Sequence, residues 1–297
     1  MTEADSTRPR LRSEPADIAR WREADLPEGA TGLWWLGQAG FLLRHGPYSI
    51  VIDPYLSDHL AKKHRNAHFP HRRMMDAPLA PSELSGVDFV LCTHGHSDHL
   101  DPETLPALAE ASPKARFVVP RAVHNLAVKR GVPPARMITV DADEELTLAG
   151  GQSESTELRL HALPAAHEGL EYTQAGESVF LGYALELGSH RVYHSGDTVP
   201  FPGLAKRVHS LSPDLMLLPV NGRDEERARY GVPGNMTLVE ALELTREAGS
   251  QAMVGHHIDL FRFNTIDREE GLRELERRGT SEESLYLAET GLRYVLE

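Results

Sequence analysis

The feature that most constrains this chain is a dense run of histidines and aspartates directly after a short apolar stretch. Residues 87–92 are mostly apolar and predict a buried strand, and the chain then continues Thr93-His94-Gly95-His96-Ser97-Asp98-His99. Alternating side chains of an extended segment point the same way, so His94 and His96 face one point. The adjacent Asp98 and His99 diverge and serve a neighbouring point. Because imidazole and carboxylate are ligands for divalent cations, the run predicts two metal positions side by side.

The composition supports a metal site without thiolates and excludes several classes of protein. The chain has 297 residues with 16 His and a single Cys, so neither an internal disulfide nor a thiolate cage is expected, and Cys92 is predicted to pack inside a strand. No stretch reaches the length of an apolar membrane span, and the N-terminus has no apolar signal region. The formal charge of −13 argues against nucleic acid as a partner. We therefore expect a cytoplasmic protein that acts on a small molecule, with no membrane partner.

Short apolar runs separated by turn residues predict an α/β fold. The runs at 32–36, 41–44 and 49–52 predict an antiparallel meander, in which Trp34 and Trp35 face opposite sides of the sheet. Further strands are predicted at 87–92, 117–119, 137–140, 157–163, 179–187, 191–194, 215–220 and 252–255, helices at 101–111, 122–130, 238–248 and 268–278, and a closing hairpin at 285–288 and 292–296. Residues 1–30 are expected to form an N-terminal arm with one short helix near 16–24. A meander with strand–helix units appears in each half without a linker, so we expect one domain, 31–297: a four-layer αβ/βα sandwich of two mixed β-sheets flanked by helices.

Three later segments extend the histidine run and carry a resemblance. His167 follows a predicted strand, Asp197 stands in His194-Ser195-Gly196-Asp197-Thr198, and His256-His257 precedes Ile258-Asp259-Leu260-Phe261. Together with the run, these segments resemble the signature of the metallo-β-lactamase superfamily, whose fold is the four-layer sandwich. The resemblance implies that His94, His96 and His167 hold a first metal, that Asp98, His99 and His257 hold a second, and that Asp197 bridges both. His257 is preferred because relatives place the ligand before an x-Asp-x-Phe pattern, and the alternative with His256 on the metal remains open.

A narrower resemblance covers residues from about 30 to 265. Trp35-Leu36-Gly37-Gln38-Ala39-Gly40-Phe41, Ile52-Asp53-Pro54-Tyr55-Leu56-Ser57-Asp58, Pro219-Val220-Asn221-Gly222-Arg223-Asp224, Gly234-Asn235-Met236 and Phe261-Arg262-Phe263-Asn264-Thr265 resemble the L-ascorbate-6-phosphate lactonase branch. This resemblance implies a hydrolase with two divalent metal ions, Zn²⁺ or Mn²⁺, and suggests a homo-oligomer. A metal-bound hydroxide would open a lactone or ester of a small, anionic or phosphorylated sugar-like molecule, and Asp98 would also pass a proton to the leaving oxygen. Two alternatives remain open: a phosphodiesterase or nuclease of the same fold, and a metal-binding protein without turnover.

Several other polar residues are candidates for supporting roles. Asn221, Arg223 and Asn235 follow a predicted strand or lie in a glycine-rich loop, and are expected to bind a polar or anionic substrate. The alternative is a surface ion pair for Arg223 and a turn for Asn235. Asp53, at the end of a predicted strand, either accepts a hydrogen bond from a ligand imidazole or caps a turn.

The segment 59–75 stands out in an acidic chain because no acid lies between Asp58 and Asp76. It contains several histidines together with Lys62, Lys63, Arg65, Arg72 and Arg73. We hypothesise that part of it forms a cationic rim that attracts a phosphorylated substrate. A solvated loop and a subunit contact are the other interpretations.

Overall fold

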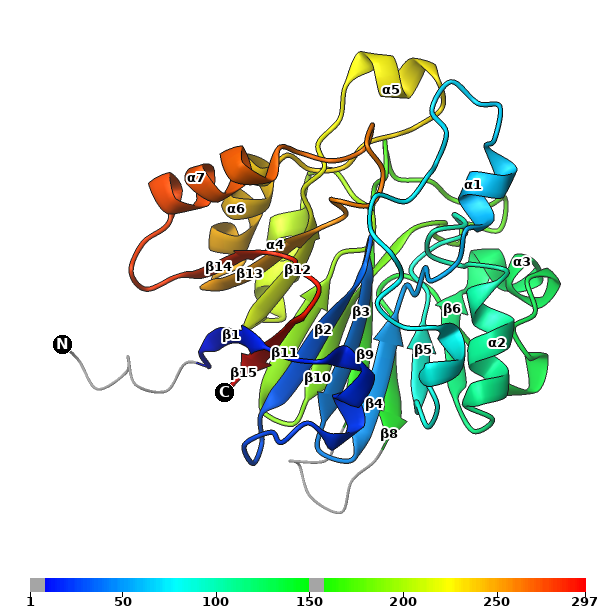
Figure 1. Cartoon of the computed structure of the whole chain (residues 1–297), viewed down its shortest axis with the longest axis horizontal. Helices are drawn as coiled ribbons and strands as arrows, with labels where there is room; N and C mark the ends of the chain where they lie inside the picture. Colours follow the sequence, from blue (N-terminus) through cyan, green and yellow to red (C-terminus); the bar gives the residue numbers. More distant parts are fainter. Residues whose placement is uncertain (1–8, 150–157) are drawn as a thin grey trace.

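Two β-sheets pack face to face between two layers of helices in the computed structural model, which describes residues 9–149 and 158–297 (Figure 1). The first sheet has the order β1-β15-β2-β3-β4-β5-β6-β7 and the second has the order β14-β13-β12-β11-β10-β9-β8. The strands of the first sheet are β1 (Leu11–Pro15), β2 (Thr31–Gly37), β3 (Gly40–His45), β4 (Tyr48–Ile52), β5 (Phe89–Leu91), β6 (Arg116–Pro120), β7 (Met137–Val140) and β15 (Leu292–Leu296). Those of the second are β8 (Glu145–Ala149), β9 (Leu158–Pro164), β10 (Leu181–Leu187), β11 (His190–His194), β12 (Leu215–Pro219), β13 (Ala252–His256) and β14 (Ser284–Leu287). The expected four-layer sandwich is confirmed.

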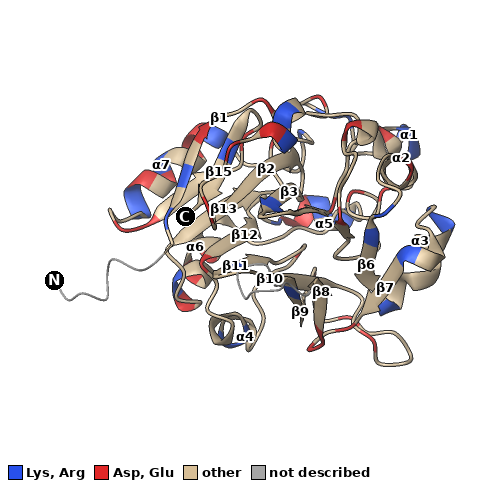
Figure 2. Cartoon of the chain, turned by 90° about the horizontal axis from the view of Figure 1, so that it is seen from below, with Lys and Arg blue, Asp and Glu red and all other residues tan. Residues whose placement is uncertain are grey.

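Helices cover the outer face of each sheet, and two short ones lie above the ends of the strands. On the side of the first sheet are α2 (Thr104–Ala111) and α3 (His124–Lys129), and on the side of the second are α4 (Leu204–Ser210), α6 (Leu238–Glu247) and α7 (Arg268–Arg278) (Figure 1). The helices α1 (His59–Lys63) and α5 (Glu225–Arg229) stand apart from these layers, at the top of Figure 1. Acidic and basic side chains are interspersed along outer elements such as α7, as Figure 2 shows from below. No helix among the described residues is long and apolar enough to cross a bilayer.

The period-two pattern of β2 places its side chains in two separate cores. Leu33 and Trp35 belong to the core between the sheets, where they join Tyr183 of β10. Trp34 faces the other way, into the core that includes Leu105 of α2. All these side chains are almost completely buried. The predicted division of the two tryptophans between the sheet interface and a helix layer is confirmed.

The C-terminal part of the chain differs from the predicted hairpin. The strand β14 pairs in parallel with β13 in the second sheet, whereas β15 pairs antiparallel with β2 and β1 in the first sheet. The two strands are close in sequence and contain residues that favour β-structure, so their local pattern matches a hairpin. The two strands belong to different sheets, so the prediction of a hairpin was wrong.

Part of the expected N-terminal arm belongs to the first sheet. Residues Leu11–Pro15 form the edge strand β1, and the short helix expected near 16–24 is a 3₁₀ helix at Ile18–Glu23. The elements β8, α1, α4 and α5 were not predicted from the sequence, because each has only five to seven residues. The first residue of the strand predicted at 157–163 lies outside the described residues.

Candidate metal centre

The predicted ligands lie where several strands end at one edge of the sandwich. The His94–His99 run follows β5, His167 follows β9, Asp197 follows β11 and His257 follows β13. Within the run, the backbone N–H groups of His99 and Leu100 donate to the carbonyl of His96 at 3.2 and 2.8 Å, so the chain turns tightly there. The fold thus brings four loops that are distant in sequence to one place.

Arg130, directly after α3, holds the histidine run in its turn. Its Nη1 donates to the carbonyl oxygens of Gly95 and Leu100, each at 2.8 Å. Burial lowers the pKa of this guanidinium, which nevertheless keeps strong donors aimed at the loop. The positions of the loop's side chains therefore depend on a residue about thirty positions later in the chain.

The seven predicted ligands form overlapping groups of nitrogen and oxygen atoms. Each group has its potential ligand atoms within 4.8 Å of one another. The groups are His94, His96 and His167; His94, His99 and Asp197; and Asp98, His99 and His257. The first and third groups match the two predicted metal positions, and the second connects them.

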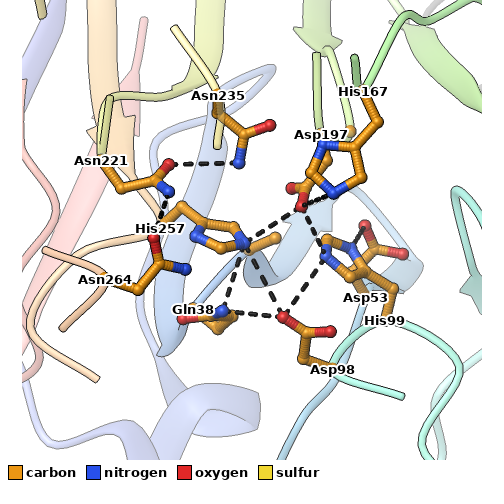
Figure 3. Close-up of polar contacts among 12 residues, drawn as sticks. Gln38, Asp53, Asp98, His99, His167, Asp197, Asn221, Asn235, His257 and Asn264 are labelled. Carbon is orange, nitrogen blue, oxygen red and sulfur yellow. Dashed lines mark hydrogen bonds and ion pairs between the residues drawn. The ribbon is translucent and has the colours of Figure 1, made fainter. Parts of the chain in front are cut away.

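Asp197 lies at the centre of the arrangement (Figure 3). Its Oδ2 atom is 3.2 Å from His257 Nε2, 3.4 Å from His99 Nε2 and 3.5 Å from His167 Nε2. Asp98 Oδ2 is 3.8 Å from Nε2 of both His99 and His257. The Asp197 carboxylate is thus close to imidazoles from both predicted metal positions, where a bridging ligand would be expected.

Asp53 orients two of the candidate ligands through three short hydrogen bonds. Its carboxylate accepts from the Thr93 backbone N–H at 2.7 Å, from Thr93 Oγ1 at 2.6 Å and from His99 Nδ1 at 2.7 Å. Since the Thr93 hydroxyl donates to Asp53, it accepts from His94 Nδ1 at 3.0 Å. Both imidazoles are therefore held with Nε2 directed at the centre, which agrees with the outer-partner interpretation of Asp53.

Buried atoms without partners show that the residues fit a cation. Within the described residues, His94 Nε2, His99 Nε2 and Asp197 Oδ1 are buried and make no hydrogen bond. Burying such atoms is costly unless another group satisfies them. The donor set of neutral nitrogen and carboxylate oxygen suits a divalent transition metal.

The electrostatics at the centre is dominated by burial and by close contact between imidazoles and carboxylates. Burial lowers the pKa of His94 well below its usual value, so this ring is neutral and able to ligate. Burial also acts on His99, but Asp197 and Asp53 outweigh it and raise the pKa of His99 well above its usual value. For Asp197, burial opposes ionisation, but His257 and His99 prevail and the pKa is well below normal. The site thus attracts positive charge at the point where the carboxylates meet.

His256 and His257 have separate environments. His257 has a left-handed backbone (φ 64°) and lies in the Asp98–His99 group. His256 ends β13, stacks on His194 at 4.9 Å and contacts Phe41 edge-on. This geometry favours His257 as the ligand, in agreement with the preferred assignment.

Gln38 is a site residue for which the sequence analysis assigned no role. Its Nε2 donates to Asp98 Oδ2 at 2.8 Å and lies 3.1 Å from His257 Nε2 (Figure 3). Its backbone carbonyl also accepts from the His257 N–H at 2.9 Å. The sequence signal that could have identified Gln38 is its place in the turn Gly37-Gln38-Ala39-Gly40. In the structure, Gln38 has a φ of 52° in this turn.

The structure places Asn221, Arg223 and Asn235, expected to bind substrate, outside the wall of the cavity that opens beside Asp98 and His257. Arg223 lines a second cavity, which shares His167 with the first. Asn221 donates to Asn264 Oδ1 at 2.7 Å and accepts from Asn235 Nδ2 at 3.1 Å. Arg223 makes two 2.7 Å contacts with Glu240, the ion pair that was the alternative interpretation. Among these residues, Asn264 is the one that reaches the first cavity.

The cavity has a volume of about 350 Å³ and opens beside Asp98, His167 and His257. From the basic segment, Lys63, His64, His68 and His71 line it. Arg73 does not: its guanidinium donates to the carbonyls of Met75 at 3.1 Å and Tyr55 at 3.1 Å, and burial lowers its pKa. Of the lysines and arginines in the hypothesised cationic rim, Lys63 is therefore the one that lines the cavity. Arg73 instead connects the segment to the backbone of Tyr55.

Comparison with known families identifies the chain. The model of the beta-lactamase superfamily domain matches residues 48–258. The chain belongs to this superfamily. The match includes all seven predicted ligands.

Several curated relatives carry the name metal-dependent hydrolase. A UPF0173 metal-dependent hydrolase of Archaeoglobus fulgidus is 26% identical over 85% of this chain and 94% of its own length. One from Rubrobacter xylanophilus is 26% identical over 79% of this chain and 84% of its own length. An uncharacterized protein of Mycobacterium tuberculosis, Rv0906, is 27% identical, and this chain spans 59% of its length.

Solved structures share the fold. A metallo-β-lactamase fold protein from Bacillus subtilis, YhfI, is 17% identical with a TM-score of 0.59 and covers 90% of this chain and 99% of its own. The isothiocyanate hydrolase from Delia radicum gut bacteria is 19% identical with a TM-score of 0.67, over 88% and 98% of the two chains. At this level of identity the likeness concerns the fold.

Proposed function

We propose that this chain is a metal-dependent hydrolase with two divalent ions, zinc or manganese, that opens a lactone or ester of a small anionic molecule. The observation that carries the proposal is the arrangement of the ligands around Asp197, whose Oδ2 lies 3.2–3.5 Å from three imidazole nitrogens. The names of the relatives from Archaeoglobus fulgidus and Rubrobacter xylanophilus support the same class of activity.

The residues of the site would have different roles in hydrolysis. His94, His96 and His167 would hold one cation, Asp98, His99 and His257 the other, and Asp197 both. When bound, such a pair of cations acidifies water and polarises a carbonyl oxygen. Asp98 lies on the cavity wall with its Oδ2 held by Gln38, so it is placed to pass a proton to the leaving oxygen.

Lys63 supports the proposal that the substrate is anionic, because this residue is exposed on the cavity wall. A cation at the mouth of a cavity attracts an anion and strengthens its binding. The sugar-like part of the expected substrate has less support, since Asn221, Arg223 and Asn235 are engaged with other side chains.

The test of the activity combines metal analysis with a substrate panel. We expect the purified protein to hold two equivalents of metal, a chelator to abolish turnover, and His96→Ala to lose metal. The panel contains simple lactones, carboxylic esters and bis-p-nitrophenyl phosphate. Faster hydrolysis of the phosphodiester than of every lactone and ester would favour the phosphodiesterase alternative, and bound metal without any turnover would favour the non-catalytic one.

The anionic preference is tested separately by Lys63→Ala. We expect KM for an anionic ester to rise several-fold while kcat stays close to wild type, with a weaker dependence on salt. Lys62→Ala is the matched control, because Lys62 pairs with Glu103 at 2.6 Å and does not line the cavity. Equal KM values for both variants would contradict a role for Lys63.

A further inference from the structure

One side of the cavity is built from rings contributed by three separate parts of the chain. The rings belong to His68, Phe69 and His71 after α1, Tyr230 after α5, and Phe261 after β13. They share the cavity with Asp98 and His167 of the metal centre. We call these five residues the ring wall.

The rings contact one another in ordered pairs. His68 stacks on Tyr230 with 3.8 Å between centroids and 7° between planes. Phe69 meets Tyr230 edge-on at 5.7 Å, and His71 meets Phe261 edge-on at 5.1 Å. Phe69 also stacks on Phe263 at 4.8 Å, which supports it from behind the wall. The wall is thus a packed set of rings, with geometry set by aromatic contacts.

Within the ring wall, His68 and Tyr230 are exposed, Phe69 and His71 are partly buried, and Phe261 is buried. Tyr230 keeps 50% of its surface accessible, and the small apolar cluster beneath includes Phe261 at 1% but neither Phe69 nor Tyr230. Exposed aromatic surface on the wall of a concave site is typical of ligand contact.

Two ring nitrogens of the ring wall already have polar neighbours. Nδ1 of His71 is paired with the Phe69 carbonyl at 2.9 Å, and burial lowers the pKa of His71 to about 4, so this ring is neutral. Nε2 of His68 lies 3.6 Å from Glu226. Asn264 also lines the cavity, and its Oδ1 already accepts from Asn221 and Arg227. A planar apolar group would find ring faces and edges on this side of the cavity.

We infer that the ring wall selects substrates carrying a planar aromatic group, which lies against Phe69 and Tyr230 while the ester or lactone carbonyl lies at the metal centre. This inference rests on the proposed function and specifies its substrate class. The specificity arises because stacking against a flat ring is lost when the substrate's ring is saturated and puckered, although its apolar surface is similar.

The test compares 2-phenylethyl acetate with 2-cyclohexylethyl acetate, whose ester bonds have similar intrinsic reactivity. We expect kcat/KM of the metal-loaded protein to favour the phenyl ester by roughly fivefold to tenfold. Phe69→Leu and Tyr230→Leu keep apolar bulk but remove a ring, and each should bring the ratio close to one. Tyr172→Leu is the control, since Tyr172 is equally exposed and lies outside the cavity wall, and it should keep the wild-type ratio.

A binding measurement separates this inference from the proposed function. Phenylacetate and cyclohexylacetate are compared by calorimetry as ligands of the wild type, Tyr230→Leu and Tyr172→Leu. A preference for phenylacetate that is lost only in Tyr230→Leu supports the ring wall even when no ester is turned over, a result that would defeat the proposed activity alone. Equal affinity of the wild type for both acids, or a preference that Tyr230→Leu leaves unchanged, would overturn the inference.

Discussion

His256 and His257 are neighbours in the chain, but one dihedral angle gives them different environments. The left-handed backbone of His257 turns the chain at the end of β13 and directs its ring to Asp98 and Asp197. Gln38 and Asp53, which contact candidate ligands directly, also have positive φ angles of 52° and 44°. Such conformations are uncommon for residues with a side chain and cluster at functional sites, where surrounding contacts maintain them.

At this scale, Asp53→Asn is expected to weaken metal binding about 10- to 100-fold. An amide nitrogen would replace one oxygen that now accepts from Thr93 and His99, so the imidazoles of His94 and His99 would lose their fixed orientation. Metal affinity is measured by competition with a chromophoric chelator. Asp88→Asn serves as the control, because Asp88 accepts two similar hydrogen bonds from Ser49 away from the centre. Wild-type affinity in Asp53→Asn would contradict the proposed orienting role.

At the scale of elements, the metal centre depends on contacts between a helix terminus and a loop. Arg130 follows α3 and fixes the histidine run through the carbonyls of Gly95 and Leu100. The amphipathic pattern of 122–130 predicts a helix there, but it does not identify the loop that its last arginine contacts.

We expect Arg130→Met to lower the free energy of unfolding by about 2 kcal/mol and to weaken metal binding, because the partly buried carbonyls of Gly95 and Leu100 lose a charged donor. Lys129→Met, at the exposed neighbouring position, should change stability by less than about 0.5 kcal/mol. Urea unfolding of the metal-free variants and chelator competition of the metal-loaded ones provide the two measurements. Unchanged metal affinity in Arg130→Met would show that the histidine run keeps its conformation without the hydrogen bonds from Arg130.

At the scale of the whole molecule, the two sheets are joined by a buried polar contact as well as by their apolar core. Thr31 Oγ1 of the first sheet lies 2.9 Å from His45 Nδ1 of the same sheet and 3.0 Å from His190 Nδ1 of the second. Burial, with a smaller effect of His45, lowers the pKa of His190 to about 4. Because His190 is buried between the sheets in its neutral form, we expect acid to weaken their packing.

Between about pH 6.5 and pH 4 the unfolded chain binds a proton at His190 that the folded chain does not bind. Stability therefore rises with pH in this window and is lost as the pH falls through it. We expect the wild type to lose about 2 kcal/mol more than His190→Gln between pH 7.5 and pH 4.5, allowing for partial solvent screening. Urea unfolding at both pH values measures this difference. His124→Gln, at an exposed site, should follow the wild type, and parallel losses in wild type and His190→Gln would refute the assignment.

Local patterns in the sequence determined most of the fold and the candidate ligands of the histidine run. Apolar alternation predicted β2, β3 and β4 with the division of Trp34 and Trp35, because the period of side-chain direction is a property of the strand itself. The spacing of His94, His96, Asp98 and His99 similarly placed four chemical groups within one turn.

Only the tertiary structure decided which distant groups meet. It separated β14 from β15, engaged Arg223 with Glu240, brought Gln38 to Asp98 and assembled the ring wall from three segments. Each of these outcomes depends on packing between residues far apart in sequence, and on backbone angles that such packing stabilises. No local period encodes them, so they follow from the folded chain as a whole.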